Sequence, residues 1–415
     1  MKKLTAIALT AAIVVSAFTI SACNDEKNNN VVSPESVEEI DSSVSEVSEE
    51  ESSEVVSDIA AVESKPEISA SKLSEINAFI SNYKNIPSFS SSSEGIEAKK
   101  ISSGKTIDLI LDNSSFTFSS LVAQQFKNAA SSAGFESVIC GESDGTSTYY
   151  SSELESAIKQ SDVVLMYGDI NKDDVATQIE IAQANGIRVL SAGSVGKGEK
   201  DHYVDYTIPI NYQLAGKLLA DWAVFKNKGK VNALAINNSD SMLSSAIYKG
   251  FADEFQTYVT SGYCTVVSGS NLEVGNGLAL KIKQAVEKDP NLNYVIVLDD
   301  SMINDAISGV AQSGKKLGII STGGSLSAFE AAENGSLEML VAQSYEWTAY
   351  AMVDYALRVL NKSELPQEQD VPVRVVTAES IKDDLNNNTY PDIGGFYEIC
   401  FGASFLTGYS GLWNL

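Results

Sequence analysis

The chain has 415 residues, of which 44% are apolar and 20% charged, enough for two to three folded domains with a sizeable core. It has 29 lysine and arginine residues against 55 aspartate and glutamate residues, a formal charge of -26. Such an acidic chain repels nucleic acid, so we expect no nucleic-acid partner. The only histidine is His202, and none of the four cysteines forms a Cys-x-x-Cys pair. We therefore expect no metal, no cofactor and no histidine-based catalysis.

The N-terminal segment has the pattern of an export signal. A basic start, Met1-Lys2-Lys3, precedes an apolar stretch from Leu4 to Ile20 that is too short to favour a membrane-spanning helix. Ile20-Ser21-Ala22-Cys23 resembles the lipobox of bacterial lipoproteins. The resemblance implies cleavage before Cys23 and a diacylglyceryl group, with acyl chains such as palmitate, on its sulfur. The alternative is a plain secretory signal with an incidental cysteine.

The next segment has a different composition. Between Asn24 and Pro66 there are 13 acidic and 2 basic residues and no aromatic residue, so this segment cannot bury enough apolar surface to fold. We interpret it as a disordered, extended tether. Ser71 to Tyr83 then has apolar residues at helical spacing behind Ser69, which predicts a short helix able to dock on the main domain.

From Lys105 onward, short apolar runs alternate with amphipathic helical stretches. Strands are expected at Thr106 to Leu111, Ser137 to Cys140, Val163 to Tyr167 and Arg188 to Ser191, and again at Val231 to Ile236, Thr265 to Val267, Tyr294 to Leu298 and Leu317 to Ser321. The pattern predicts βα units around parallel sheets, in two halves with a cleft between them. Ligands of such sheets bind beyond the carboxyl ends of the strands.

From Lys105 to about Ser380 the sequence resembles the type I periplasmic binding proteins, in the branch of ribose-like and galactose-like sugar receptors. The resemblance rests on several short segments in a fixed order, among them Ile107-Asp108-Leu109-Ile110, Asn185-Gly186-Ile187, Asn211 to Gly216, Lys249-Gly250-Phe251, Asp299-Asp300 and Val341-Ala342-Gln343. It implies two α/β lobes, each Rossmann-like with a parallel sheet, joined by a three-segment hinge.

With that resemblance the chain divides as follows: a signal peptide at 1–22, a tether at 23–68, a docking helix and linker at 69–104, a first lobe at 105–209 plus 344–371, a second lobe at 210–343 plus 372–384, and an aromatic C-terminal extension at 385–415. The extension could pack on the protein or meet a partner. Once Cys23 carries lipid, Cys140, Cys264 and Cys400 can form at most one disulfide.

Sugar recognition requires aromatic rings for the apolar faces and planar polar groups for the hydroxyls. The resemblance places stacking aromatic residues at Phe116 and Phe118, a hydroxyl-binding carboxylate at Asp299 and a hinge glutamine at Gln343. The other expected ligand-binding residues are Asn238, Ser245 and Trp347, and Tyr167 and Tyr345 are further candidates. Core packing is the competing interpretation for the aromatic residues, and helix capping for Asp299 and its neighbour Asp300.

Charged residues that hold sugars in the family are missing at three places here. Gly193-Ser194 stands in place of an Asp-Arg pair, Ser245 in place of an arginine and Gly323 in place of an acidic residue. Each lost charge-assisted hydrogen bond is worth about 1.5 to 3 kcal/mol. We therefore expect a ligand that is bound differently from ribose or galactose.

The sequence thus predicts a non-enzymatic, monomeric solute-binding lipoprotein on the outer face of the bacterial cytoplasmic membrane. It would capture a sugar or sugar-like ligand by lobe closure and deliver it to the permease subunits of an ABC transporter. The alternative is a sensory or interaction lipoprotein with a degenerate cleft. A hydrolase using Asp299 and Asp300 is disfavoured because adjacent side chains diverge, and a repressor because of the export signal.

Overall fold

The computed structural model describes residues 56–62, 65–114, 117–196, 201–366, 371–385, 397 and 400–415, all within one compact unit, Ser52–Leu415. Within these ranges the side chains of residues 117–118, 194–196 and 209 are outside the description. The signal segment, Cys23, most of the expected tether and Phe116 lie outside the described residues, and so does the side chain of Phe118.

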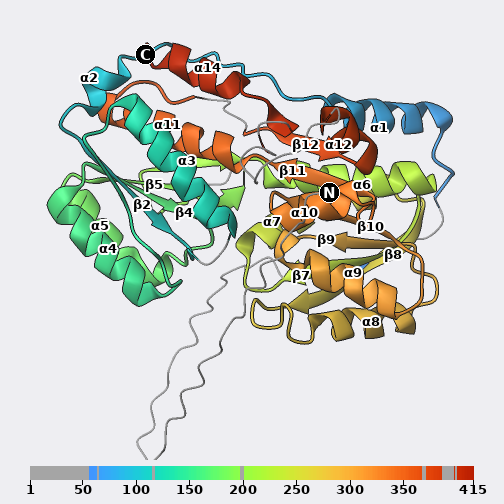
Figure 1. Cartoon of the computed structure of the whole chain (residues 1–415). Coiled ribbons are helices and arrows are strands. Elements are labelled where there is room, and N and C mark those ends of the chain that lie inside the picture. Colours follow the sequence, from blue (N-terminus) through green and yellow to red (C-terminus); the bar gives the residue numbers. More distant parts are fainter. Residues whose placement is uncertain are drawn as a thin grey trace, which may run out of the picture. The chain divides into compact units, whose positions relative to one another are not determined.

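The first lobe is built on a five-stranded, all-parallel sheet in the order β3-β2-β4-β5-β6. Its strands are β2 (Thr106–Leu111), β3 (Ser137–Cys140), β4 (Val163–Tyr167), β5 (Arg188–Gly196) and β6 (Tyr206–Ile210). Its helices are α2 (Ala98–Ser102), α3 (Thr117–Ala133), α4 (Ser147–Gln160), the 3-10 turn η1 (Asp173–Val175), α5 (Ala176–Ala184) and α11 (Tyr345–Asn361). Helices α4 and α5 cover one face of the sheet, and α3 and α11 cover the other (Figure 1).

This two-sided cover explains why the strands are continuous apolar runs. Side chains alternate between the faces of a strand, so every residue of a doubly covered strand is buried. Met166 of β4 packs with Leu154 of α4 and Ile179 of α5. Leu165, the residue before it, packs on the opposite side with the core that contains Phe126 of α3.

The second lobe is built on a seven-stranded sheet in the order β1-β8-β7-β9-β10-β11-β12. Its strands are β1 (Ile59–Val62), β7 (Lys230–Asn238), β8 (Ser261–Gly269), β9 (Tyr294–Val297), β10 (Gly318–Gly323), β11 (Met339–Gln343) and β12 (Val373–Val376). The two edge strands are antiparallel to their neighbours and the central strands are parallel. Its helices are α1 (Ala70–Asn82), α6 (Tyr212–Asn227), α7 (Met242–Tyr258), α8 (Leu278–Lys288), η2 (Asp300–Met302), α9 (Ile303–Gln312), α10 (Leu326–Glu333) and α12 (Ala378–Leu385).

Strand β1 corrects the expected extent of the tether, which was drawn to residue 68. Ile59 pairs with Cys264 and Val62 with Gly262 of β8. The carboxylate of Asp58 also accepts a hydrogen bond from Val266 N at 2.7 Å. An edge strand offers unpaired backbone groups, so these few apolar residues gain an ordered partner despite the acidic composition around them.

Several helices begin at a side chain that caps the first backbone N–H groups, as the polar residues before the apolar runs predict. The N-caps with such a bond are Ser69, Thr146, Asn211, Ser241, Ser325 and Ser344. Helix α1, capped by Ser69, buries Ile76 and Ile80 and packs on α6. The predicted helix therefore does lie against the folded protein.

Between β2 and β12 the chain passes between the lobes three times, from β6 to α6, from β11 to α11, and from α11 to β12. The last described helix, α14 (Ser404–Leu412), packs on α11 (Figure 1). The tail thus returns to the protein, one of the two possibilities that the sequence left open.

Cys140, Cys264 and Cys400 are free thiols in this structure. No helix of the described residues is long and apolar enough to cross a membrane.

Candidate functional site

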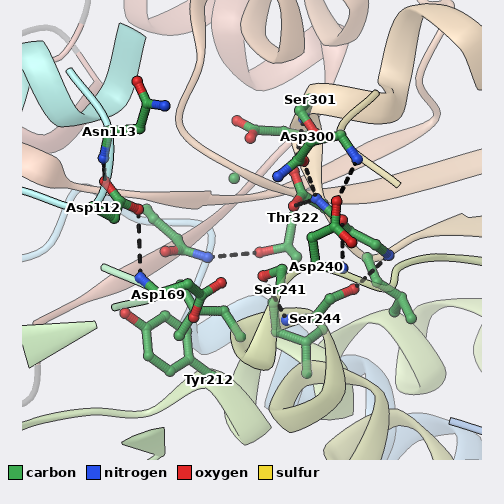
Figure 2. A pocket seen from close by; sticks show the side chains of 18 of the residues that line it. Asp112, Asn113, Asp169, Tyr212, Asp240, Ser241, Ser244, Asp300, Ser301 and Thr322 are labelled. Atoms are coloured by element: carbon green, nitrogen blue, oxygen red, sulfur yellow. Dashed lines mark hydrogen bonds between the residues drawn. The ribbon is translucent and has the colours of Figure 1, made fainter. Parts of the chain in front are cut away.

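A cavity of about 290 Å³ lies between the two sheets, at the carboxyl ends of their strands. This is close to the lower end of small-molecule sites, which measure about 300–1,000 Å³. Residues that follow β2 and β4 line it from the first lobe, and residues at or just after the ends of β7, β8, β9 and β10 line it from the second (Figure 2). The polar lining residues include Asp112, Asn113, Asp169, Asn238, Asp240, Ser241, Ser244, Asn271, Asp299, Asp300, Ser301, Thr322 and Gln343.

Three of the residues predicted from the sequence lie together at this cavity. Asn238 Nδ2 donates to Asp299 Oδ2 at 2.7 Å, and Gln343 Nε2 donates to Thr322 Oγ1 at 3.2 Å. Asp299 also accepts from Ser301 N at 2.9 Å, so one carboxylate both caps η2 and faces the cavity. The two interpretations of Asp299 are therefore compatible.

Two predicted residues lie elsewhere. Trp347 is 4% exposed and is not among the lining residues. Its ring stacks on Phe405 of the tail at 5.2 Å and on Phe89 at 5.9 Å. Ser245 is also not among the lining residues. Its neighbour Ser244 is, and the Ser244 hydroxyl accepts a hydrogen bond from Asn238 N at 3.1 Å. Of the further candidates, Tyr167 and Tyr345 line the cavity.

Sequence reasoning missed the aspartates of the first lobe. Asp112 directly follows β2 and accepts from Asn113 N and Ser119 Oγ, both at 2.7 Å. Asp169 follows β4 and its backbone N–H donates to Asp112 Oδ2 at 3.4 Å. Gly168 between them has a φ of +94°, and a Cβ there would collide with the Asp112 carboxylate. An aspartate at the end of a predicted strand was the available signal, the same one that marked Asp299.

Asp300 has a structural place in the wall. It is 8% exposed, and its Oδ2 accepts from Gly324 N at 2.9 Å and Ser325 N at 2.7 Å, which ties the end of β9 to the end of β10. Burial, with a smaller contribution from Asp299, raises the pKa of Asp300 to about 6. Gly323, where the family pattern has an acidic residue, lies against this carboxylate with a φ of +145°.

The cavity wall is strongly acidic. Burial raises the pKa of Asp112, and it raises that of Asp169 to about 7, with further contributions from the charges of Asp112 and Asp299. The tyrosines that line the cavity are Tyr150, Tyr167, Tyr212 and Tyr345. In the described part of the chain, no group of three or more His, Cys, Asp or Glu side chains is arranged to hold a metal ion.

Two α/β lobes with a cavity between the carboxyl ends of their strands define the fold of two-lobe ligand-binding proteins. Residues 107–364 match the family model described as a periplasmic binding protein domain, and the chain belongs to this family. Among curated protein sequences, none matches this one closely enough to indicate a relative.

Solved structures share the fold at low sequence identity. One is an ABC transporter solute-binding protein from Agrobacterium vitis bound with alpha-D-tagatopyranose, with 18% identity and a TM-score of 0.57 over 67% of this chain and 96% of that one. Another, from Actinobacillus succinogenes with bound D-allose, has 18% identity and a TM-score of 0.56 over 67% and 99%. A third, from Mycobacterium smegmatis in complex with beta-D-fucofuranose, has 17% identity and a TM-score of 0.58 over 71% and 98%.

Proposed function

We propose that this protein is the solute-binding lipoprotein of an ABC transporter, and that it captures a sugar or sugar-like ligand in the cavity between its lobes. The observation that carries the proposal is a polar cavity whose wall comes from both sheets, in a chain of the periplasmic binding protein family. Contacts made to both lobes at once supply the free energy that closes them around the ligand. The structural neighbours that hold bound sugars favour capture over a purely sensory role.

Asp299, Asn238 and Gln343 are the residues we assign to the ligand hydroxyls. They offer a carboxylate and two amides, the planar donors and acceptors that hydroxyl groups need. Phe116 and Phe118 stay proposals for stacking on an apolar sugar face. No covalent chemistry is assigned, because Asp299 faces Asn238 whereas Asp300 binds Gly324 N and Ser325 N, so the two carboxylates do not converge on one point.

The test is a thermal-shift screen of the chain from residue 24 onward against monosaccharides, alditols, amino sugars, oligosaccharides, nucleosides and amino acids. A ligand that binds only the folded state raises the melting temperature by mass action. Gln343→Ala and Asp299→Asn should each weaken binding of the active compound by about two- to a hundredfold, the range for neutral and charged hydrogen bonds. Ser245→Ala, outside the cavity lining, is the matched control and should leave the affinity unchanged.

Unchanged affinity in both cavity variants would place the site elsewhere. No shift with any compound would instead favour the interaction lipoprotein.

The proposed anchor is the lipid on Cys23, which would hold a monomeric receptor on the outer membrane face beside its permease. Cys23→Ser removes the only sulfur in the lipobox-like segment. It should move the protein from the membrane fraction to the soluble exported fraction. Retention in the membrane fraction would contradict lipidation at this residue.

A further inference from the structure

The charge of the cavity wall is unbalanced. Of its 22 described lining residues, five are aspartates and none is lysine, arginine or histidine. The aspartates come from both lobes: Asp112, Asp169, Asp240 and Asp300, which Figure 2 labels, and Asp299. Asp112 and Asp300 are buried, Asp169 and Asp299 are partly buried, and Asp240 is exposed. Buried charges in proteins are normally paired or coordinate a metal. Because no cationic side chain is among the described lining residues, this wall does not supply the counter-charge itself.

Neutral groups satisfy most of these carboxylates. Asp112 binds Asn113 N and Ser119 Oγ, and Asp240 Oδ2 accepts from Asn271 N at 2.8 Å. Asp299 and Asp300 accept from backbone N–H groups and, for Asp299, from the Asn238 amide. These donors stabilise a carboxylate without cancelling its charge. A positively charged group of the ligand would therefore be attracted by several carboxylates at once.

Asp169 differs from the other four. Its Oδ1 is buried and has no hydrogen-bond partner within the described part of the chain. Burial has the largest effect on the pKa of this carboxyl group and raises it, whereas the Ser241 hydroxyl and Leu243 N–H favour its charged form, and the charges of Asp112 and Asp299 disfavour it. A buried acceptor without a donor is costly, and a bound ligand can supply the missing donor.

The tyrosines of the cavity wall also favour a positively charged ligand. The ring of Tyr212 is 4% exposed and lies near Asp169 (Figure 2), and Tyr167, 5% exposed, also lines the cavity. The negative face of an aromatic ring attracts a cation, and this attraction strengthens when water is excluded. Carboxylates and tyrosine rings around one small space are the surroundings that an ammonium group prefers.

We propose that the ligand carries a protonated amine, as an amino sugar or an amino polyol does, and that Asp169 Oδ1 binds its ammonium group. This inference rests on the proposed function and narrows its ligand class. Asp299, Asn238 and Gln343 then bind the hydroxyls, and Asp169 determines the preference for the amine. The charged residues with which the sugar receptors of the family hold aldoses are absent here, which agrees with a ligand that is itself charged.

The test uses pairs of compounds that differ by one hydroxyl or amine: glucose and glucosamine, galactose and galactosamine, sorbitol and 1-amino-1-deoxysorbitol. Titration calorimetry at pH 7 should show that in at least one pair the amine binds about ten- to a hundredfold more tightly, the effect of a charge-assisted hydrogen bond. N-acetylglucosamine, which fills the same position without the charge, should bind no better than glucose.

Asp169→Asn keeps the shape and removes the charge. It should abolish the preference for the amine within the pair, because the ammonium group loses its counter-charge. Asp253→Asn, exposed on α7, is the control and should leave the affinities for both members of the pair unchanged. Equal or tighter binding of the neutral members would overturn the inference and leave the proposed function standing. An Asp169→Asn variant that still prefers the amine would also overturn it. If no compound of any pair binds and no other sugar does, the proposed function fails and the inference fails with it.

Discussion

Asp108 is a buried carboxyl group in the middle of β2, away from the cavity lining. It is 0% exposed, Ser161 Oγ donates to its Oδ2 at 3.4 Å, and its Oδ1 has no partner among the described residues. Burial raises its pKa to about 7, and the charge of Glu153 on α4 adds to the shift. The folded state therefore keeps a proton that the unfolded state, with its ordinary pKa of 3.8, loses at lower pH.

This difference predicts the sign of a pH effect. Between about pH 4 and pH 7 the native state binds more protons than the unfolded state, so the contribution of Asp108 to stability falls as the pH rises through that window. A shift from 3.8 to about 7 corresponds to a loss of up to about 4 kcal/mol. Asp108→Asn should flatten the fall in the free energy of unfolding, measured by urea denaturation at pH 5 and pH 8.

Part of this fall in the free energy of unfolding with pH should persist in Asp108→Asn. Asp169, Asp221 and Asp300 also have raised pKa values, and they contribute to the fall with the same sign. Asp253→Asn, at an exposed position of α7, should retain the full slope. A slope equally steep in Asp108→Asn and in the parent protein would show that Asp108 ionises normally.

At the scale of elements, the contact of α6 with α7 depends on two glycines. A Cβ at Gly216 would collide with the carbonyl oxygen of Ile247 and lie 2.6 Å from Phe251 N, and one at Gly250 would collide with Gln213 O. The helices therefore approach backbone to backbone. This contact explains in physical terms why the sequence has glycine at both positions.

Gly216→Ala should lower the free energy of unfolding by about 1–3 kcal/mol or more, because the added methyl group forces the two helices apart. Gly411→Ala is the matched control. It lies on an exposed face of α14 with no atom within 4 Å of the added Cβ, so it should be neutral or stabilise by up to about 1 kcal/mol through helix propensity. Urea midpoints of the two variants measure the difference, and equal midpoints would rule out the close contact.

Helix α14 covers aromatic residues of α11. Phe405 is 2% exposed and stacks on Trp347, and Trp413 Nε1 donates to Asp354 Oδ1 at 2.9 Å. Phe405→Ala should destabilise the protein by about 3–5 kcal/mol, the usual effect of removing a buried phenylalanine. Leu406→Ala, at a residue that is 40% exposed, should have a much smaller effect. Similar melting temperatures for both variants would mean that the tail adds little to the fold.

These elements also show how far sequence reasoning reaches. It predicts Thr106–Leu111 and Val163–Tyr167 with the bounds of β2 and β4, because a strand buried on both faces is a local signal. It misses Ile59–Val62, since that strand exists only through pairing with β8, far along the chain. At the site, it finds Asp299 and Gln343 from strand ends and resemblance, but it cannot show that the tail covers Trp347.

At the scale of the whole folded unit, the segment between α1 and α2 also connects the two lobes, in addition to the three chain crossings between β2 and β12. Beyond α1, Tyr83 O accepts from Val375 N at 2.8 Å and Lys84 O from Arg374 Nε at 2.9 Å, both on β12 of the second lobe. Further along, Glu94 O accepts from Arg358 Nη2 at 3.1 Å and Ile96 N donates to Leu412 O at 2.7 Å, on the side of the first lobe. This segment therefore adds a connection that lobe opening must accommodate.

Ligand binding should still narrow the distance between the lobes, because the cavity wall comes from both. Fluorescent labels on Ser147→Cys, exposed at the start of α4, and Leu272→Cys, 85% exposed beyond β8, would report that distance. Burial raises the pKa of Cys140 to about 11 and those of Cys264 and Cys400 to about 12, so the native thiols should react slowly with the labels.

Adding the most tightly bound compound of the screen should raise the energy-transfer efficiency of this pair. A second pair, Leu272→Cys and Glu287→Cys, lies within the second lobe and should not respond. Energy transfer that stays constant in the first pair while calorimetry shows binding would mean that the ligand enters without closure. In that case Asp112 and Asp169 of the first lobe would already lie at their final distance from Asp299 of the second lobe before the ligand arrived. Ligand capture would then not require lobe closure.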